Sequence, residues 1–144
     1  MKVTIFAACL WLSIGPGNYS PERYRYVDRI TAEFPQPEHQ QDLALFINSS
    51  FTSQNEKVRA LHYWISTNIE YDVKNIFNDQ EKSNVLESRI GVCSDFVNLF
   101  LETASLINLE AHRIDGYSRI NGEVNLVPHS WIIVQLDDLS LIHI

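Results

Sequence analysis

The chain has 144 residues, of which 45% are hydrophobic, and its formal net charge is -7 at pH 7. This length and composition predict a single globular domain with its own core. Lysine and arginine do not cluster along any segment, so we do not expect the chain to bind nucleic acid, because neutralising phosphates requires basic surface.

The N-terminus has the composition of an export signal. Lys2 precedes an almost unbroken apolar run from Val3 to Ile14, too short to span a bilayer, and Gly15-Pro16-Gly17 ends the pattern. A buried first strand or helix is the alternative. We expect residues 1–17 to be a signal peptide and residues 18–144 to form the domain. The mature protein would then be periplasmic or extracellular, without stable insertion in a membrane.

Three segments with apolar residues at helical spacing follow, and we expect helices over 21–34, 43–50 and 54–69. Ser20-Pro21 supplies an N-cap and a first-turn proline. Ser53 and Glu56 form the Ser-x-x-Glu capping box, which makes the third helix the best defined.

The second half of the chain predicts a loop, a core helix and antiparallel strands. The polar residues 71–79 indicate a loop, and a short helical segment around Val85-Leu86 leads to a longer helix from Cys93 to Leu109. Strands are expected over 111–119 and 130–136, with a tight turn at Asn121-Gly122. Helices followed by antiparallel strands give the fold class α+β.

Cys93 is the leading candidate for a chemical role. The other cysteine, Cys9, lies in the predicted signal, so the mature domain has one thiol and no disulfide. Backbone N–H groups at a helix start and a nearby imidazolium lower the pKa of a thiol, and we expect the Cys93 N–H to help stabilise an oxyanion. We expect Gly91 to let the chain turn sharply into the helix. A buried structural cysteine is the alternative.

Among the five histidines, His129 is the favoured base. It opens the apolar strand after Pro128, where its imidazole could face the start of the cysteine helix. A surface histidine at a turn is the alternative interpretation. His112, near the start of the preceding strand, is the one serious rival, because His39 and His62 are expected on helix surfaces and His143 is almost terminal.

Four segments resemble the transglutaminase-like superfamily, in particular its bacterial and kyphoscoliosis-peptidase-like members: 64–72, 85–93, 115–117 and 129–131. The resemblance covers about residues 25–138. It implies a papain-like core with Cys93 as nucleophile at a helix N-terminus, His129 as base, and an aspartate on the next strand to orient the imidazole. Ser130 and Ile132 stand where the family often has alanine and asparagine.

The resemblance implies an aspartate that orients the His129 imidazole, and this sequence has no aspartate at the expected position. With a two-residue turn at Asp137-Asp138, His129 would face position 146, beyond the end of the chain. Residues 139–144 alternate like an edge strand but also resemble a translated sequencing-adapter tail. We therefore expect the true coding sequence to diverge near Asp138 and the remaining strands of the domain to be absent.

Other residues near the two candidates have less specific roles. Asp95 in the first helical turn is expected to cap the helix rather than to take part in catalysis. Trp131 is expected in the core or the wall of the site. Arg89 and Tyr117 could line a cleft, and packing explains them equally well.

Two functions are consistent with these features. The first is an exported thiol enzyme, a cysteine peptidase or acyltransferase, that acts on peptide or glutamine-type amides through Cys93 and His129. Its partner would be a protein or peptide substrate, with cell-wall peptides as one candidate class. The second is a non-catalytic binding or structural module on the same scaffold. Neither requires a cofactor, and one thiol with scattered histidines offers no metal-ligand spacing.

Overall fold

The computed structural model describes residues 20–75, 84–120, 122–137 and 141–143, so the predicted signal segment lies outside the described residues. Five α-helices are found in this part of the chain: α1 (Pro21–Ala32), α2 (Gln40–Ser50), α3 (Gln54–Asn68), α4 (Val85–Ser88) and α5 (Cys93–Leu106). A 3-10 turn, η2, covers Val73–Asn75. The strands are β1 (Glu70–Tyr71), β2 (Ile90–Gly91), β3 (Glu110–Ile120), β4 (Glu123–Gln135) and β5 (Leu141–His143).

The expected starts of α1 and α3 are confirmed, whereas α2 begins at Gln40 rather than at Leu43. The Ser20 side chain accepts a hydrogen bond from the backbone N–H of Arg23, and Pro21 occupies the first turn of α1. At α3, the Ser53 hydroxyl accepts from the Glu56 N–H while the Glu56 carboxylate accepts from the Ser53 N–H. Local sequence therefore determines where both helices begin.

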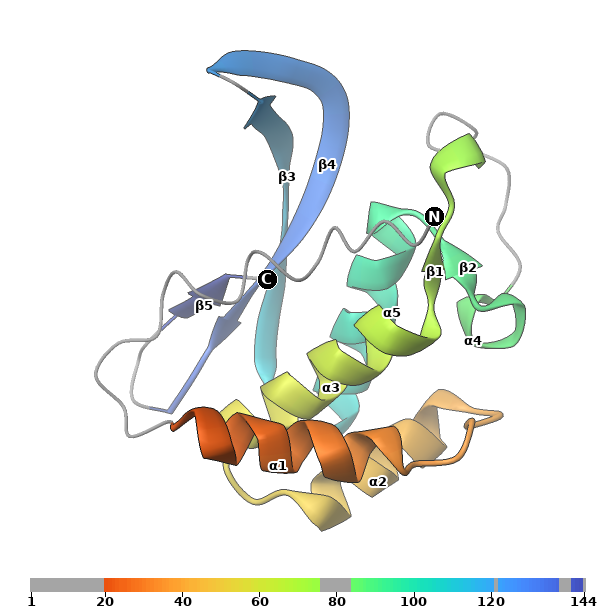
Figure 1. Cartoon of the computed structure of the whole chain (residues 1–144). Coiled ribbons are helices and arrows are strands. Elements are labelled where there is room, and N and C mark those ends of the chain that lie inside the picture. Colours follow the sequence, from red (N-terminus) through yellow and green to blue (C-terminus); the bar gives the residue numbers. More distant parts are fainter. Residues whose placement is uncertain (1–19, 76–83, 121, 138–140, 144) are drawn as a thin grey trace.

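The strands form two separate sheets. β1 and β2 pair in parallel, and β3, β4 and β5 form an antiparallel sheet in that order. β3 and β4 make a long bent ribbon whose hairpin end stands clear of the helices (Figure 1), and Gly122 near its tip adopts φ 87°. The predicted α+β class is confirmed.

Several predicted boundaries differ from the structure. α5 ends at Leu106 rather than Leu109, because Asn108 takes a left-handed conformation with φ 56° that stops the helix. β4 begins at Glu123, well before the predicted 130, because its first half pairs with β3 although its apolar residues Val124 and Leu126 are exposed. Tyr71 was expected in a loop but belongs to β1. The prediction missed this strand because two residues are too few to show the alternation of apolar and polar residues that indicates a strand.

The structure does not have the two-residue turn at Asp137-Asp138 on which the expected facing position of His129 depended. Gln135 pairs with Leu141 and Ile133 with His143, so the connection between β4 and β5 is longer than two residues. The backbone N–H of Asp137 donates to the Gln54 side chain, 2.6 Å away, which ties the end of β4 to the start of α3. Asp138 itself lies outside the described residues.

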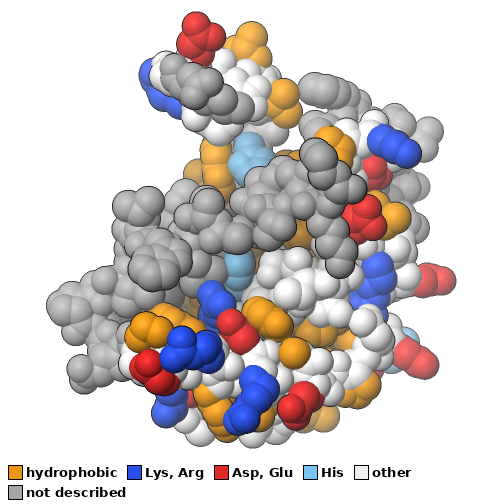
Figure 2. All heavy atoms as spheres, viewed as in Figure 1, with side chains coloured by type: hydrophobic (Ala, Val, Ile, Leu, Met, Phe, Trp, Pro, Cys, Tyr) orange, Lys and Arg blue, Asp and Glu red, His pale blue; other side chains and the backbone are white. Residues whose placement is uncertain are grey.

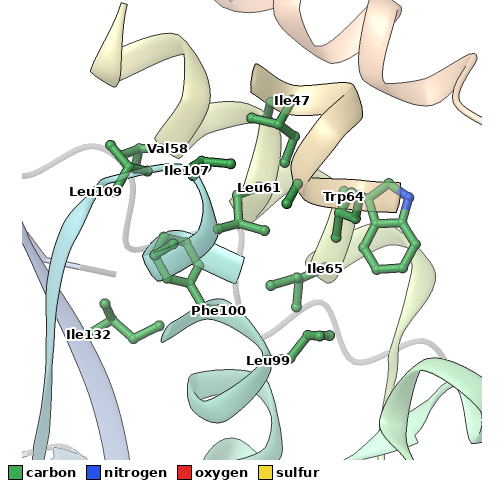
Figure 3. Packing of buried hydrophobic residues seen from close by; sticks show 14 of the residues in the cluster. Ile47, Val58, Leu61, Trp64, Ile65, Leu99, Phe100, Ile107, Leu109 and Ile132 are labelled. Atoms are coloured by element: carbon green, nitrogen blue, oxygen red, sulfur yellow. The ribbon is translucent and has the colours of Figure 1, made fainter. Parts of the chain in front are cut away.

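The core surrounds α5, which contacts α2, α3, β3 and β4. Phe100 extends from α5 toward Ile132 of β4, with Leu61 of α3 beside it (Figure 3), and these three side chains are almost fully buried. The face expected to be internal is confirmed at Val97, Phe100, Ala104 and Ile107. Burial along this face fixes the helix against the sheet and therefore fixes the position of its first residue.

Charged side chains of both signs are mixed over the helices on the face drawn in Figure 2. The projecting ribbon carries apolar side chains, and Tyr117, Val124 and Leu126 are exposed there. None of the helices in the described part of the chain is both long and apolar enough to cross a membrane.

His62 corrects one prediction, because it is buried rather than on a helix surface. Its ring lines a small cavity with Ile65, Phe96 and Ser130. Burial lowers the His62 pKa to about 4, and the nearby Arg59 guanidinium acts in the same direction. The imidazole is therefore neutral in the folded protein at physiological pH.

This buried histidine predicts an acid-sensitive fold. The unfolded chain takes up the His62 proton near pH 6.5, whereas the folded state resists it down to about pH 4, so stability is lost as pH falls between these values. Between about pH 7.5 and about pH 5, we expect His62 alone to lower the free energy of unfolding by about 2 kcal/mol. Urea unfolding of His62→Gln should show a flatter pH dependence, and the exposed-residue control His112→Gln should not.

Candidate active site

The site is built around the first turn of α5. The backbone N–H of Val92 donates to the Asp95 carboxylate, 2.8 Å away, so Asp95 caps the helix as expected. Its negative charge also suits the positive end of the helix dipole. Cys93 is the first helical residue and its side chain is half-buried.

Gly91 is required for a different reason from the predicted turn. Its φ is not in the left-handed region, and it lies in β2 opposite Tyr71 of β1. A Cβ built on Gly91 would lie 2.8 Å from the Asp95 Cβ, closer than side chains approach one another. The glycine therefore makes room for the capping residue beside Cys93.

We expect Gly91→Ala to lower the free energy of unfolding by about 1–3 kcal/mol, because the contact with Asp95 forces the backbone apart. Urea denaturation measures this loss. Gly116→Ala is the matched control, since its Cβ would meet only the Trp131 ring, at 3.3 Å, and a side chain can move. Equal losses in the two variants would contradict this account of Gly91.

The structure brings Cys93 and His129 together. The two side chains are hydrogen-bonded, and the backbone N–H groups of Ser130 and Ser94 also donate to the Cys93 sulfur. The hydrogen bond with His129 is the main reason that the pKa of Cys93 falls to about 7, against the opposing effect of burial. A substantial share of this thiol is therefore ionised at neutral pH.

The long ribbon positions His129. His129 lies opposite Gly116 of β3, and its ring meets the Trp131 ring edge-on with centroids 4.8 Å apart. Trp131 also covers Gly116, which leaves the imidazole bounded on one side by the indole. The expectation that Trp131 forms a wall of the site fits this geometry.

A polar network fastens the strand beside His129. The Ser130 hydroxyl donates to Asp115, 2.6 Å away, and accepts from Arg113, 2.9 Å away. Arg113 also pairs with Asp115 at 2.8 Å and reaches Asn98 of α5 at 3.4 Å. These bonds lower the Asp115 pKa. The network joins β3, β4 and α5 next to Ser130, whose N–H donates to the thiol.

The other candidates lie elsewhere. His112 is exposed and pairs with Glu110 at 3.3 Å, and the contacts of Cys93 involve His129 instead. Arg89 places its guanidinium 5.1 Å from the Trp64 ring centre and donates to the Pro37 carbonyl, so it packs against the helical body. Tyr117 is exposed on the ribbon, opposite Pro128.

Among the described residues, no ion pair joins a carboxylate to the His129 imidazole. The pairing of β4 with β5 covers Ile133 to Gln135, four or more residues along the strand from His129. The described residues also contain no group of three or more His, Cys, Asp or Glu side chains that could hold a metal ion.

Sequence reasoning missed one residue of the site, Tyr71. Its ring packs on Phe96 of α5, with centroids 5.9 Å apart, and its hydroxyl is hydrogen-bonded to Cys93. Burial raises the Tyr71 pKa, and the neighbouring Cys93 thiolate raises it further. Tyr71 lies in the segment 64–72, which resembles the family, and this was the only sequence feature that pointed to it. The residues of that segment do not indicate that its side chain contacts the thiol.

The helix that begins at Cys93 packs on the antiparallel sheet that carries His129, as the family resemblance implies. Residues 41–143 match the model of the Transglutaminase-like superfamily, and the chain belongs to this superfamily. Among curated proteins, none matches the chain in sequence.

Three solved structures share the fold. A candidate cysteine protease from Cytophaga hutchinsonii is 19% identical with a TM-score of 0.56 over 87% of this chain. A transglutaminase is 17% identical with a TM-score of 0.52 over 88%, and a candidate protease from Parabacteroides distasonis is 13% identical with a TM-score of 0.51 over 83%. This chain spans 42%, 33% and 25% of their respective lengths.

Proposed function

We propose that the protein is a thiol enzyme that cleaves or transfers acyl groups at peptide or glutamine-type amides, with Cys93 as nucleophile and His129 as general acid and base. The observation that carries the proposal is the hydrogen bond between the half-buried Cys93 thiol and the His129 imidazole at the start of α5. Membership of the Transglutaminase-like superfamily supports this class of chemistry.

The reaction would proceed in two stages. The Cys93 thiolate attacks the amide carbonyl carbon, a C–S bond forms, and the carbonyl oxygen becomes an oxyanion. The His129 imidazolium donates its proton to the leaving nitrogen as the C–N bond breaks. Water or an amine then attacks the thioester while His129 accepts its proton, and the Cys93 thiolate leaves.

The proposal is tested by two assays on the same preparation. One measures new amino termini from a peptide mixture, and the other measures incorporation of a fluorescent primary amine into a glutamine-containing protein, with release of ammonia. We expect wild type to be active in at least one assay and Cys93→Ala to be inactive in both. Activity in neither assay would overturn the proposal for these substrates, and equal activity in the variant would exclude Cys93 as the nucleophile.

A binding module without turnover is the second candidate, favoured by the absence of an ion pair between a carboxylate and His129 among the described residues. The two candidates differ in a simple measurement. A module should retain a peptide ligand unchanged with a stoichiometry of one, whereas an enzyme should consume it. Retention of peptides by wild type and Cys93→Ala alike, without product, would favour the module.

We also propose that the protein is exported and acts on extracytoplasmic protein or peptide, with cell-wall peptides as the first class to test. The support is the basic and apolar composition of residues 1–17. Expression of the full chain followed by N-terminal sequencing of the extracytoplasmic fraction checks this. A cytoplasmic protein that retains Met1 would contradict it.

A further inference from the structure

A buried hydroxyl anchors the strand that carries His129. Ser130 is 6% exposed and lies directly opposite Asp115 of β3. Its hydroxyl donates to the Asp115 carboxylate at 2.6 Å and accepts from the Arg113 guanidinium at 2.9 Å. Because the hydroxyl is engaged both as donor and as acceptor, its orientation is fixed, and the Ser130 backbone is held with it. Ser130 stands where the superfamily often has alanine, so this anchor is a feature of this chain.

Arg113 joins three elements around the thiol. Its Nε, on β3, lies 2.8 and 3.0 Å from the two carboxylate oxygens of Asp115. One terminal nitrogen reaches Ser130 of β4, and the other lies 3.4 Å from the side-chain oxygen of Asn98 on α5. The rigid fork of a guanidinium can serve these partners at the same time. Arg113 therefore ties β4 to the helix that begins at Cys93.

The spacing between β4 and α5 matters at the sulfur. The backbone N–H of Ser130 donates to the Cys93 sulfur, and the neighbouring His129 imidazole is hydrogen-bonded to it as well. Both bonds cross from β4 to the start of α5, and hydrogen bonds weaken steeply as their geometry departs from the optimum. A shift of this part of β4 would therefore weaken two contacts that stabilise the thiolate.

We propose that Arg113 and Asp115 are positioning residues that hold the Ser130 backbone N–H, and His129 beside it, against the Cys93 sulfur. The pair acts through Ser130 rather than by contact with the sulfur. The inference rests on the proposed function and deepens it, because a thiolate held in place serves acyl transfer.

The sign of the expected effect separates positioning from charge. The titratable and charged groups around the thiol are His129 on β4, Tyr71 on β1 and Asp95 on α5, with Arg113 and Asp115 on β3 behind Ser130. Removing the Asp115 carboxylate leaves the Arg113 charge uncompensated, so charge alone would favour the thiolate and lower the Cys93 pKa. Loss of positioning weakens the bonds to the thiolate and raises that pKa instead.

The pH dependence of iodoacetamide alkylation measures the Cys93 pKa. We expect Asp115→Ala to raise the midpoint by about 0.5 pH units, the effect of weakening about one hydrogen bond, so that alkylation at about pH 6 slows about threefold. Arg113→Lys keeps the charge but lacks the fork, and should shift the midpoint in the same direction. Asp28→Ala is the matched control, since it removes another two-bonded pair, Arg59–Asp28, between α1 and α3, and should leave the midpoint unchanged.

A double substitution tests whether the pair acts through Ser130. In a Ser130→Ala background, Asp115→Ala should add no further shift, because the link to β4 is already lost. A further shift as large as the one in wild type would contradict the proposed route.

The remaining outcomes are equally decisive. An unchanged or lowered midpoint in Asp115→Ala overturns the inference, as does an equal rise in Asp28→Ala, because general loosening of the fold would then explain it. Urea unfolding monitors the fold of each variant, and if Asp115→Ala does not fold, Arg113→Lys decides by the same criterion. Alkylation needs no acyl substrate, so wild type without amide turnover contradicts the proposed function while the midpoints still decide the role of this pair.

Discussion

Replacing Cys93 with alanine is expected to reduce amide turnover by at least about 10⁴-fold, the largest effect of any single substitution in this chain. Alanine removes the atom that attacks the carbonyl, and the neighbouring donors cannot replace it. Because Cys93 is only half-buried, at the end of α5 rather than in the core, the fold should survive the change. Turnover assays and a urea unfolding curve on the same sample measure both expectations.

The matched control is Ser105→Ala, an exposed position near the other end of α5, which should retain full turnover. Cys93→Ser gives a second comparison, since a hydroxyl of ordinary pKa keeps the geometry but is a poor nucleophile. Turnover in Cys93→Ala within tenfold of wild type would show that another residue performs the reaction.

Replacing His129 with alanine is expected to raise the Cys93 pKa and to lower turnover about 10³-fold. The hydrogen bond with His129 is the main reason that this pKa lies at about 7, so without it the value should rise by about 1 to 1.5 pH units toward that of a free thiol. The sign is fixed: the thiolate of the variant forms at higher pH, so the activity that remains shifts to the alkaline side.

The pH dependence of iodoacetamide alkylation measures this change directly. Wild type should show a midpoint near pH 7, and His129→Ala should show one between about 8 and 8.5. His112→Ala is the control, since that histidine is exposed and pairs with Glu110. A midpoint that moves in the His112 variant but not in the His129 variant would reverse the assignment of the base.

Local signals in the sequence account for most of the helical part of the fold. Capping residues such as Ser20 and Ser53 act on the nearest turn, so the starts of α1 and α3 are predictable from neighbouring residues. The apolar face of α5 is likewise readable from its spacing. The close approach of Cys93 to His129 was expected from the family resemblance, and the structure shows it.

The features that were missed depend on contacts between distant segments. The parallel pair of β1 and β2 joins residues about twenty positions apart, and neither strand is long enough to show a pattern. Tyr71 reaches Cys93 only through that pairing. His62 is buried because α5 and β4 cover it, which its own helix could not indicate. The reason for Gly91 also appears only when the Asp95 side chain is in place.

The most direct test of the Cys93–His129 pair is mass spectrometry of the protein during reaction with an acyl donor at pH 7. We predict a covalent acyl adduct, mapped by peptide digestion to Cys93, that accumulates in wild type and forms far more slowly in His129→Ala. An adduct on another residue, or one that forms on Cys93 equally fast without His129, would contradict the pairing of nucleophile and base on which the account rests.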